Sequence, residues 1–118
     1  MEIDKETQQR IQEIQILEHN LHNLIMQKQA FQLELNETLN SLEEVKKTDE
    51  EIYKVTGSIM LRADKDIVIK ELEEKKKIFE LRLSTIEKQE KLLESKAKEL
   101  QEETKKLMEK DKPKKIND

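Results

Sequence analysis

Cysteine and tryptophan are absent from this 118-residue chain, and glycine and proline each occur once. Without cysteine the chain has no disulfide bond, thiolate metal ligand or thiol nucleophile, and it fits a reducing compartment. A single glycine excludes a glycine-rich phosphate-binding loop. No run of apolar residues exceeds three, which is too short for a membrane span or the core of a signal peptide. We therefore expect a cytoplasmic protein with no membrane partner.

Apolar residues are scarce, whereas charged residues abound. The chain is 34% hydrophobic and 42% charged, with one tyrosine and two phenylalanines, while a typical globular domain is about 45–50% apolar and about 25% charged. Glutamate, lysine, leucine and glutamine dominate, a composition typical of long helices. The net charge of −4 comes from 27 acidic and 23 basic residues that are interspersed along the chain. This balance disfavours binding to nucleic acid.

The apolar residues follow a heptad pattern in both halves of the chain. Alternating steps of four and three residues from Ile3 to Val45 reach nine apolar residues in thirteen positions. The same steps from Ile69 to Leu107 reach nine in twelve. Sustained heptads of this kind predict helices that pack along a partner helix, so we expect the two segments to form a coiled coil.

The boundaries of these helices follow from the residues that flank the heptads. We expect the first helix at about 3–48 and the second at about 65–111, which would make a single domain of residues 1–112. Pro113 disfavours helical structure in the residue before it, so residues 113–118 should form a disordered tail. Two helices of similar length that are joined by a tight reversal are expected to pair antiparallel.

The pattern changes around the only glycine. Residues 51–63 alternate between faces with β-branched and aromatic side chains on either side of Thr56-Gly57-Ser58. This alternation predicts a β-hairpin that turns at those three residues. A continuous helix is disfavoured, because glycine inside a helix costs about 1 kcal/mol. The stretch Ala63-Asp64-Lys65-Asp66 would then supply the N-cap of the second helix, with Asp66 in the first turn, where the helix dipole favours an acid.

An isolated hairpin of this kind is marginally stable in water, and this one carries apolar side chains on both faces. Burying each such side chain is worth roughly 1.5–3 kcal/mol, and the open strand edges are available for pairing. We therefore expect hairpins from several subunits to combine into a shared sheet or barrel. The residues expected to form this oligomerisation surface are Ile52, Tyr53, Val55, Gly57, Ile59, Met60 and Leu61.

The sequence contains no pattern typical of a catalytic or cofactor site. His19 and His22 are three residues apart beside Glu18, a spacing that could hold a metal between neighbouring turns. We favour the interpretation that these histidines face solvent, because they lie outside the heptad positions. The carboxylates lie on charged helix faces without a core around them. We therefore expect no enzyme activity, no metal and no cofactor.

The order helix, single hairpin, helix resembles the β-type subunits of the prefoldin family. The most specific match is Tyr53-Lys54-x-x-Gly57-x-x-Met60-Leu61 in the hairpin. The stretches Gln27–Gln29 and Gln32–Leu35 resemble the first helix of the family, and Leu81–Leu83 and Glu87–Glu90 resemble the second. The archaeal β-type subunits are the nearer match, and eukaryotic prefoldin subunit 6 is the second.

This resemblance implies a mainly α fold and an ATP-independent molecular chaperone. In the family, two α-type and four β-type subunits form a hexamer whose hairpins build a β-barrel platform. Unfolded polypeptides are captured at the tips of the coiled coils, kept from aggregating and delivered to a group II chaperonin. In this chain the resemblance implies a client-binding tip formed by Ile3, Ile11, Ile14, Leu100, Leu107 and Met108.

Two questions stay open at the level of the sequence. A structural coiled-coil scaffold or tether would need no catalytic site either, so it is the alternative to a chaperone. The tip residues could also be no more than the last turns of the helix pair, with no role in client binding. The sequence does not identify the α-type partner or the clients.

Overall fold

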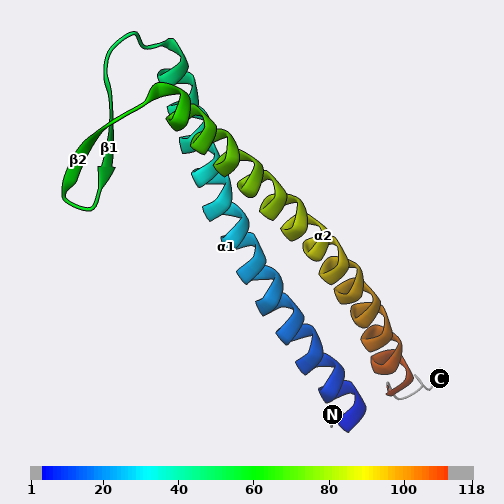
Figure 1. Cartoon of the computed structure of the whole chain (residues 1–118). Helices are drawn as coiled ribbons and strands as arrows, with labels where there is room; N and C mark the ends of the chain where they lie inside the picture. Colours follow the sequence, from blue (N-terminus) through cyan, green and yellow to red (C-terminus); the bar gives the residue numbers. More distant parts are fainter. Residues whose placement is uncertain (1–3, 112–118) are drawn as a thin grey trace, which may run out of the picture. The chain divides into compact units, whose positions relative to one another are not determined.

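The computed structural model describes residues 4–111 as two long helices separated by one β-hairpin (Figure 1). Its elements, in chain order, are α1 (Lys5–Lys47), β1 (Ile52–Thr56), β2 (Ile59–Ala63) and α2 (Lys65–Asp111). The predicted mainly α fold is confirmed. The expected tail at 113–118 lies outside the described residues. Contacts divide the chain into two compact units, which are described separately below. The first unit consists of residues 1–26 together with residues 87–118, and the second consists of residues 27–86.

Aspartate residues cap the N-termini of both helices. The Asp4 carboxylate accepts a hydrogen bond from the backbone N–H of Thr7 at 2.7 Å, and the Asp64 carboxylate accepts one from the N–H of Asp66 at 2.9 Å. These bonds satisfy donors that have no partner within the helix. A cap within the stretch from Ala63 to Asp66 was predicted, and Asp64 provides it. The cap at Asp4 was not predicted, because the heptad pattern placed the start of the first helix near residue 3.

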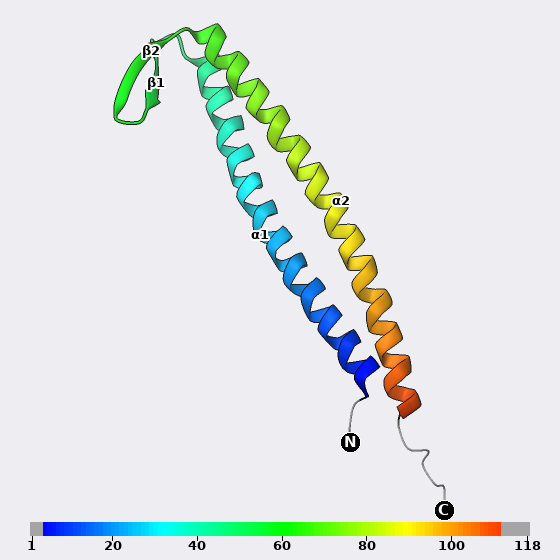
Figure 2. The same ribbon diagram turned by 60° about the horizontal axis from the view of Figure 1, so that its bottom comes forward.

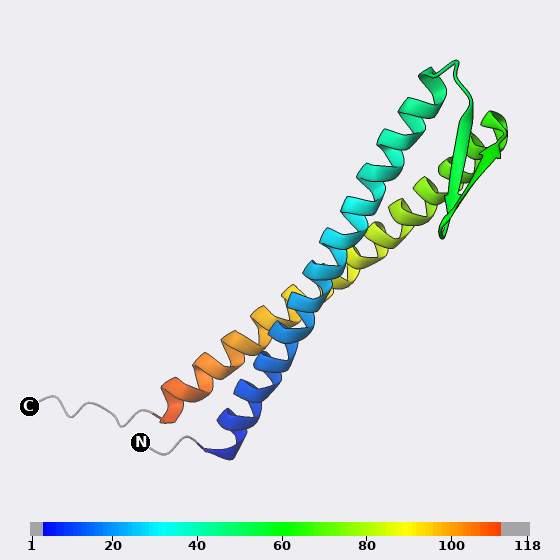
Figure 3. The same cartoon turned by 90° about the vertical axis from the view of Figure 1, so that its left-hand side faces the viewer.

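The first unit contains the beginning of α1 and the end of α2, which lie side by side (Figure 3). Its core is a small cluster of Leu17, Ala97 and Leu100, against which Ile14 and Leu93 pack. All five are predicted heptad positions. The cluster joins residues near the start of α1 to residues near the end of α2, so the two helices run antiparallel in this unit.

The second unit contains the end of α1, the hairpin and the beginning of α2 (Figure 2). The rings of Phe31 and Phe79 lie 6.2 Å apart between their centroids, and the Arg82 guanidinium lies 5.4 Å from the centroid of Phe31. Leu83 is 7% exposed, whereas Leu81, which is outside the heptad positions, is 69% exposed. The heptad pattern therefore identifies the buried face of α2 in this unit.

The connection between α1 and the hairpin is anchored by Lys65, the first residue of α2. Its ammonium group donates hydrogen bonds to the carbonyl oxygens of Thr48 at 2.8 Å and Lys46 at 3.4 Å. The last carbonyl groups of a helix lack partners within the helix, and they carry partial negative charge that favours a nearby cation. The contact therefore holds the start of α2 beside the end of α1.

Candidate functional site

The hairpin is a regular two-stranded antiparallel ribbon with a two-residue turn. Val55 pairs with Met60 and Thr56 pairs with Ile59, which leaves Gly57 and Ser58 as the turn. Gly57 has a φ of 62°, and it is the only residue with positive φ in the described part of the chain. Glycine at the first central position with positive φ is the pattern of a type II′ turn, whose twist suits a hairpin. The predicted turn at Thr56-Gly57-Ser58 is therefore present.

Cross-strand partners in such a ribbon point to the same face, so the register assigns the side chains to two faces. One face carries Tyr53, Val55 and Met60, and the other carries Ile52, Ile59 and Leu61. Five of these six side chains are more than half exposed, with values of 52–66%. Only Ile52 is partly buried. Both faces of the ribbon are thus apolar and open to solvent in the isolated chain.

A polar cluster lies at the base of the ribbon. The Glu51 carboxylate contacts the Arg62 guanidinium at 2.8 Å through one oxygen and accepts a hydrogen bond from the Tyr53 hydroxyl at 2.8 Å through the other. The hydrogen bond to Glu51 raises the pKa of Tyr53 above its usual 10.0, with a smaller contribution from burial. Deprotonation would place a phenolate beside a carboxylate, which explains the direction of the shift.

The ribbon is also tied to α2. The Lys54 ammonium contacts the Glu71 carboxylate at 3.0 Å. Beside this ion pair is a depression of about 260 Å³ between β1 and the first turns of α2, lined by Tyr53, Lys54, Val55, Val68, Glu71, Leu72 and Lys75. Because this contact joins the ribbon to a helix, the exposed apolar side chains are presented from a supported element and not from a free loop.

The predicted tip residues differ in their accessibility. Met108 is 46% exposed, and it lines a surface depression together with Ile14. Ile11, Ile14 and Leu107 are partly buried. Leu100 is 7% exposed and belongs to the core cluster of the first unit, so a client could contact it only after the helices separate. Ile3 lies outside the described residues.

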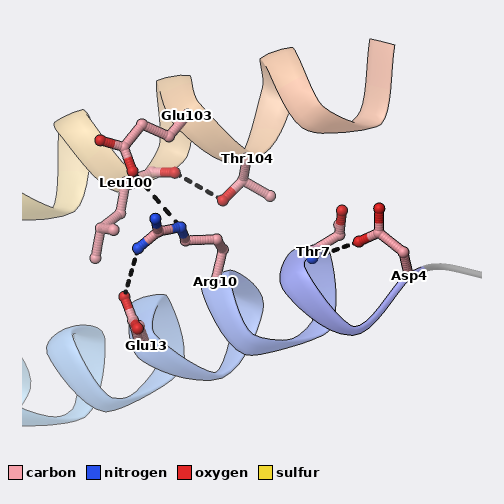
Figure 4. Close-up of polar contacts among 7 residues, drawn as sticks. All are labelled: Asp4, Thr7, Arg10, Glu13, Leu100, Glu103 and Thr104. Carbon is pink, nitrogen blue, oxygen red and sulfur yellow. Dashed lines mark hydrogen bonds and ion pairs between the residues drawn. The ribbon is translucent and has the colours of Figure 1, made fainter. Parts of the chain in front are cut away.

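Polar side chains occupy part of the interface between α1 and α2 at the tip (Figure 4). The Arg10 guanidinium lies 3.6 Å from the Glu103 carboxylate on α2 and 3.4 Å from the Glu13 carboxylate on α1. Thr7 and Thr104 are buried in the same region. The heptad pattern placed Arg10 and Thr104 at the interface, but it did not reveal which polar groups have partners there.

The structure also places the residues considered for metal binding. His19 and His22 are exposed on α1. Among residues 4–111, no group of three histidine, aspartate or glutamate side chains is arranged to hold a metal ion. Within that same part of the chain, no helix is long and apolar enough to cross a membrane.

Comparison with known proteins relates this fold to one family. The prefoldin subunit family matches residues 8–111, which include all of the second unit and most of the first. The chain is 36% identical to the prefoldin subunit beta of Archaeoglobus fulgidus over 91 residues, which cover 75% of this chain and 78% of that protein. It is 38% identical to the prefoldin subunit beta of Thermococcus onnurineus over 91 residues, with the same coverage.

Solved structures agree with the sequence comparison. The crystal structure of the prefoldin beta subunit from Thermococcus strain KS-1 matches with a TM-score of 0.83 and 33% identity, over 89% of this chain and 94% of that chain. The beta2 subunit from the same strain, at 17% identity and a TM-score of 0.66 over 74% of this chain and 95% of that chain, shares the fold. Prefoldin family members are chaperone subunits that assemble with other prefoldin subunits. With its single hairpin between two heptad-patterned helices and its match over residues 8–111, the chain belongs to the prefoldin subunit family.

Proposed function

We propose that this chain is a subunit of an ATP-independent holdase, which binds unfolded polypeptides and keeps them from aggregating. The observation that carries the proposal is the ribbon with five large side chains, apolar or aromatic, that are more than half exposed on two faces. Such a surface is a liability in a lone chain and is typical of a site that another protein covers. The similarity to prefoldin beta subunits supports the same interpretation.

The hairpin is the proposed assembly surface. Hairpins of two α-type and four β-type subunits would combine into a β-barrel platform in a hexamer. The residues that would be buried there are Ile52, Tyr53, Val55, Gly57, Ile59, Met60 and Leu61. Burial of apolar side chains and pairing of the open strand edges would both favour this assembly.

The ends of the helices in the first unit are the proposed client-binding tip. Met108 is available without any rearrangement, and methionine adapts well to varied apolar surfaces. Ile11, Ile14 and Leu107 would become fully available as the last turns separate, and Leu100 after them. Ile3 would extend the same tip. The captured chain would then pass to a group II chaperonin in the cytoplasm, without involvement of nucleic acid, membrane or cofactor.

Suppression of client aggregation tests this function directly. The chain, mixed with an α-type partner, should reduce light scattering from a chemically unfolded protein on dilution, without nucleotide. Met108→Lys should raise the concentration needed for half suppression about fivefold, because about 1 kcal/mol of apolar contact is lost from a half-exposed methionine. Met26→Lys is the matched control, since Met26 is also an exposed methionine on a helix.

Two results would contradict the proposal. If the assembled protein leaves aggregation unchanged, it is not a holdase, and a coiled-coil scaffold or tether becomes the better interpretation. If both methionine variants suppress aggregation as well as the wild type does, the holdase function stands but the client site does not include Met108.

A further inference from the structure

The outward face of α1 in the first unit carries no charged side chain. In a pair of helices, the heptad positions b, c and f point away from the partner helix. On α1 between Gln8 and Asn23, these are positions 8, 9, 12, 15, 16, 19, 22 and 23, which hold four glutamines, two histidines, one asparagine and one isoleucine. All eight side chains are exposed, and we call them the uncharged face.

The absence of charge is specific to this face. In a chain that is 42% charged, about three of eight positions should carry a charge. Of the eight corresponding positions of α2 between Lys91 and Lys106, six hold glutamate or lysine and all are exposed. Arg10 of α1 is directed to the interface, where it contacts Glu13 and Glu103 (Figure 4). Exposure to water therefore does not explain the uncharged face, whereas depletion of charge is typical of the centre of a protein interface.

A surface depression lies in the middle of the uncharged face. It has a volume of about 330 Å³ and is lined by Gln12, Gln15, Ile16 and His19. Ile16 is 61% exposed, so most of its apolar surface is available to a partner. The amide groups of the neighbouring glutamines each offer hydrogen-bond donors and an acceptor. The face thus combines one apolar contact with several polar groups that carry no charge.

This composition limits the class of partner. A partner helix, including one from a second copy of the chain, packs against apolar residues that recur along a seam, and Ile16 is the single apolar side chain of the uncharged face. A strongly acidic or basic partner finds no opposite charge there. The backbone N–H and C=O groups of a folded protein are already paired, whereas those of an unfolded polypeptide can exchange water for glutamine and asparagine amides.

We propose that the uncharged face binds an extended segment of an unfolded polypeptide, through hydrogen bonds to its backbone and apolar contact at Ile16. From Gln8 to Asn23 the face is about 24 Å long at a rise of about 1.5 Å per residue. This length matches about seven residues of extended chain at about 3.3 Å per residue. Because all proteins share the same backbone, such binding does not depend on the client's sequence. The inference rests on the proposed holdase function and adds a client contact along α1 to the proposed tip.

Photocrosslinking in the full chain, assembled with an α-type partner, locates the bound polypeptide. The chain has no cysteine, so Gln15→Cys provides a single attachment point for a benzophenone on the uncharged face. Ser95→Cys is the matched control, since Ser95 is exposed on the outward face of α2 in the same unit. The probe is a fluorescent, unstructured peptide that is rich in leucine and has no charged side chain. We expect it to crosslink from position 15 in preference to position 95.

A charge-neutral double substitution tests the same face by affinity. Gln12→Glu with Ile16→Lys places charges on the face without a change in net charge, and opposite charges at this spacing support the helix. The dissociation constant for the peptide, measured by fluorescence anisotropy, should rise about tenfold because the apolar contact of Ile16 is lost. Leu92→Glu with Ser95→Lys is the matched control, since Leu92 is 71% exposed on α2, and it should bind the peptide like the wild type.

The proposal is overturned if the peptide does not crosslink from position 15 in preference to position 95, or if the variant of the uncharged face binds it like the wild type. In either case, an assembly that still suppresses aggregation leaves the proposed function standing. Crosslinks from position 15 to another subunit overturn the proposal in favour of a contact within the assembly. If the wild-type assembly neither binds the peptide nor suppresses aggregation, the proposed function fails and this inference fails with it.

Discussion

Replacing Val55 with lysine and Met60 with glutamate should weaken assembly of this chain with other prefoldin subunits. The two residues pair directly across the hairpin, and each is 66% exposed. Opposite charges at a cross-strand pair are compatible with the ribbon, so the hairpin itself should persist. The net charge of the chain does not change. The substitution therefore removes apolar surface from one face and leaves the strand pairing intact.

The magnitude follows from the exposed fraction of the two side chains. Full burial of a valine or methionine is worth roughly 1.5–3 kcal/mol, and about two-thirds of that remains to be gained on assembly. The pair therefore contributes about 2–4 kcal/mol per hairpin. This corresponds to a weakening of the dissociation constant by roughly 30- to 1,000-fold.

Native mass measurement over a dilution series, with an α-type partner present, gives the dissociation midpoint. The matched control is Leu33→Lys with Leu81→Glu, since both leucines are similarly exposed, at 60% and 69%, and lie on helices outside the heptad positions. We expect the control to assemble like the wild type. If the hairpin variant assembles at the same concentrations as the wild type, the hairpin is not the assembly surface. If the control variant disrupts assembly equally, exposed apolar residues contribute to assembly regardless of their position.

Two further predictions concern stability and ionisation. Leu83→Ala should destabilise the fold by about 2–3 kcal/mol, which is at the low end for a buried leucine because the interface has only two helices. This loss of stability should lower the melting temperature by about 8–12 °C. Leu81→Ala, at an exposed position, should change the stability by less than about 0.5 kcal/mol. Melting is followed by circular dichroism, and equal melting curves for the two variants would contradict the assigned buried face of α2. Glu51→Gln should return the pKa of Tyr53 toward 10.0, as read from phenolate absorbance of the only tyrosine. Because the pKa of Tyr53 is raised in the folded state, the hydrogen bond between Tyr53 and Glu51 stabilises the fold below pH 10.0. That stability is lost as the pH rises through the folded-state pKa of Tyr53. An unchanged titration of Tyr53 in the Glu51→Gln variant would count against the hydrogen bond.

The fold was largely predictable because its signals are local. Every predicted heptad position among the described residues is buried or partly buried, and the contrast between Leu83 and Leu81, only two residues apart, shows how sharply the pattern separates the two faces. The hairpin was predictable for a similar reason, since alternation and a glycine with positive φ act over a few residues. The cap at Asp4 was missed because Ile3 extends the heptad pattern past the true start of α1.

The candidate tip was less predictable. Leu100 and Leu107 are both heptad positions near the end of α2, yet Leu100 is 7% exposed and Leu107 is only partly buried. Helical spacing assigns a residue to a face, but the depth of burial depends on what the partner helix places opposite it.

The amino-acid sequence by itself determined the two helices, the turn at Gly57 and the buried faces, because periods of 3.6 and 2 residues depend only on neighbours along the chain. Only the tertiary structure decided which polar groups have partners. The Lys54 contact with Glu71 and the Arg10 contact with Glu103 depend on residues brought together from different elements. Such distances arise from packing, and no local pattern in the chain encodes them directly.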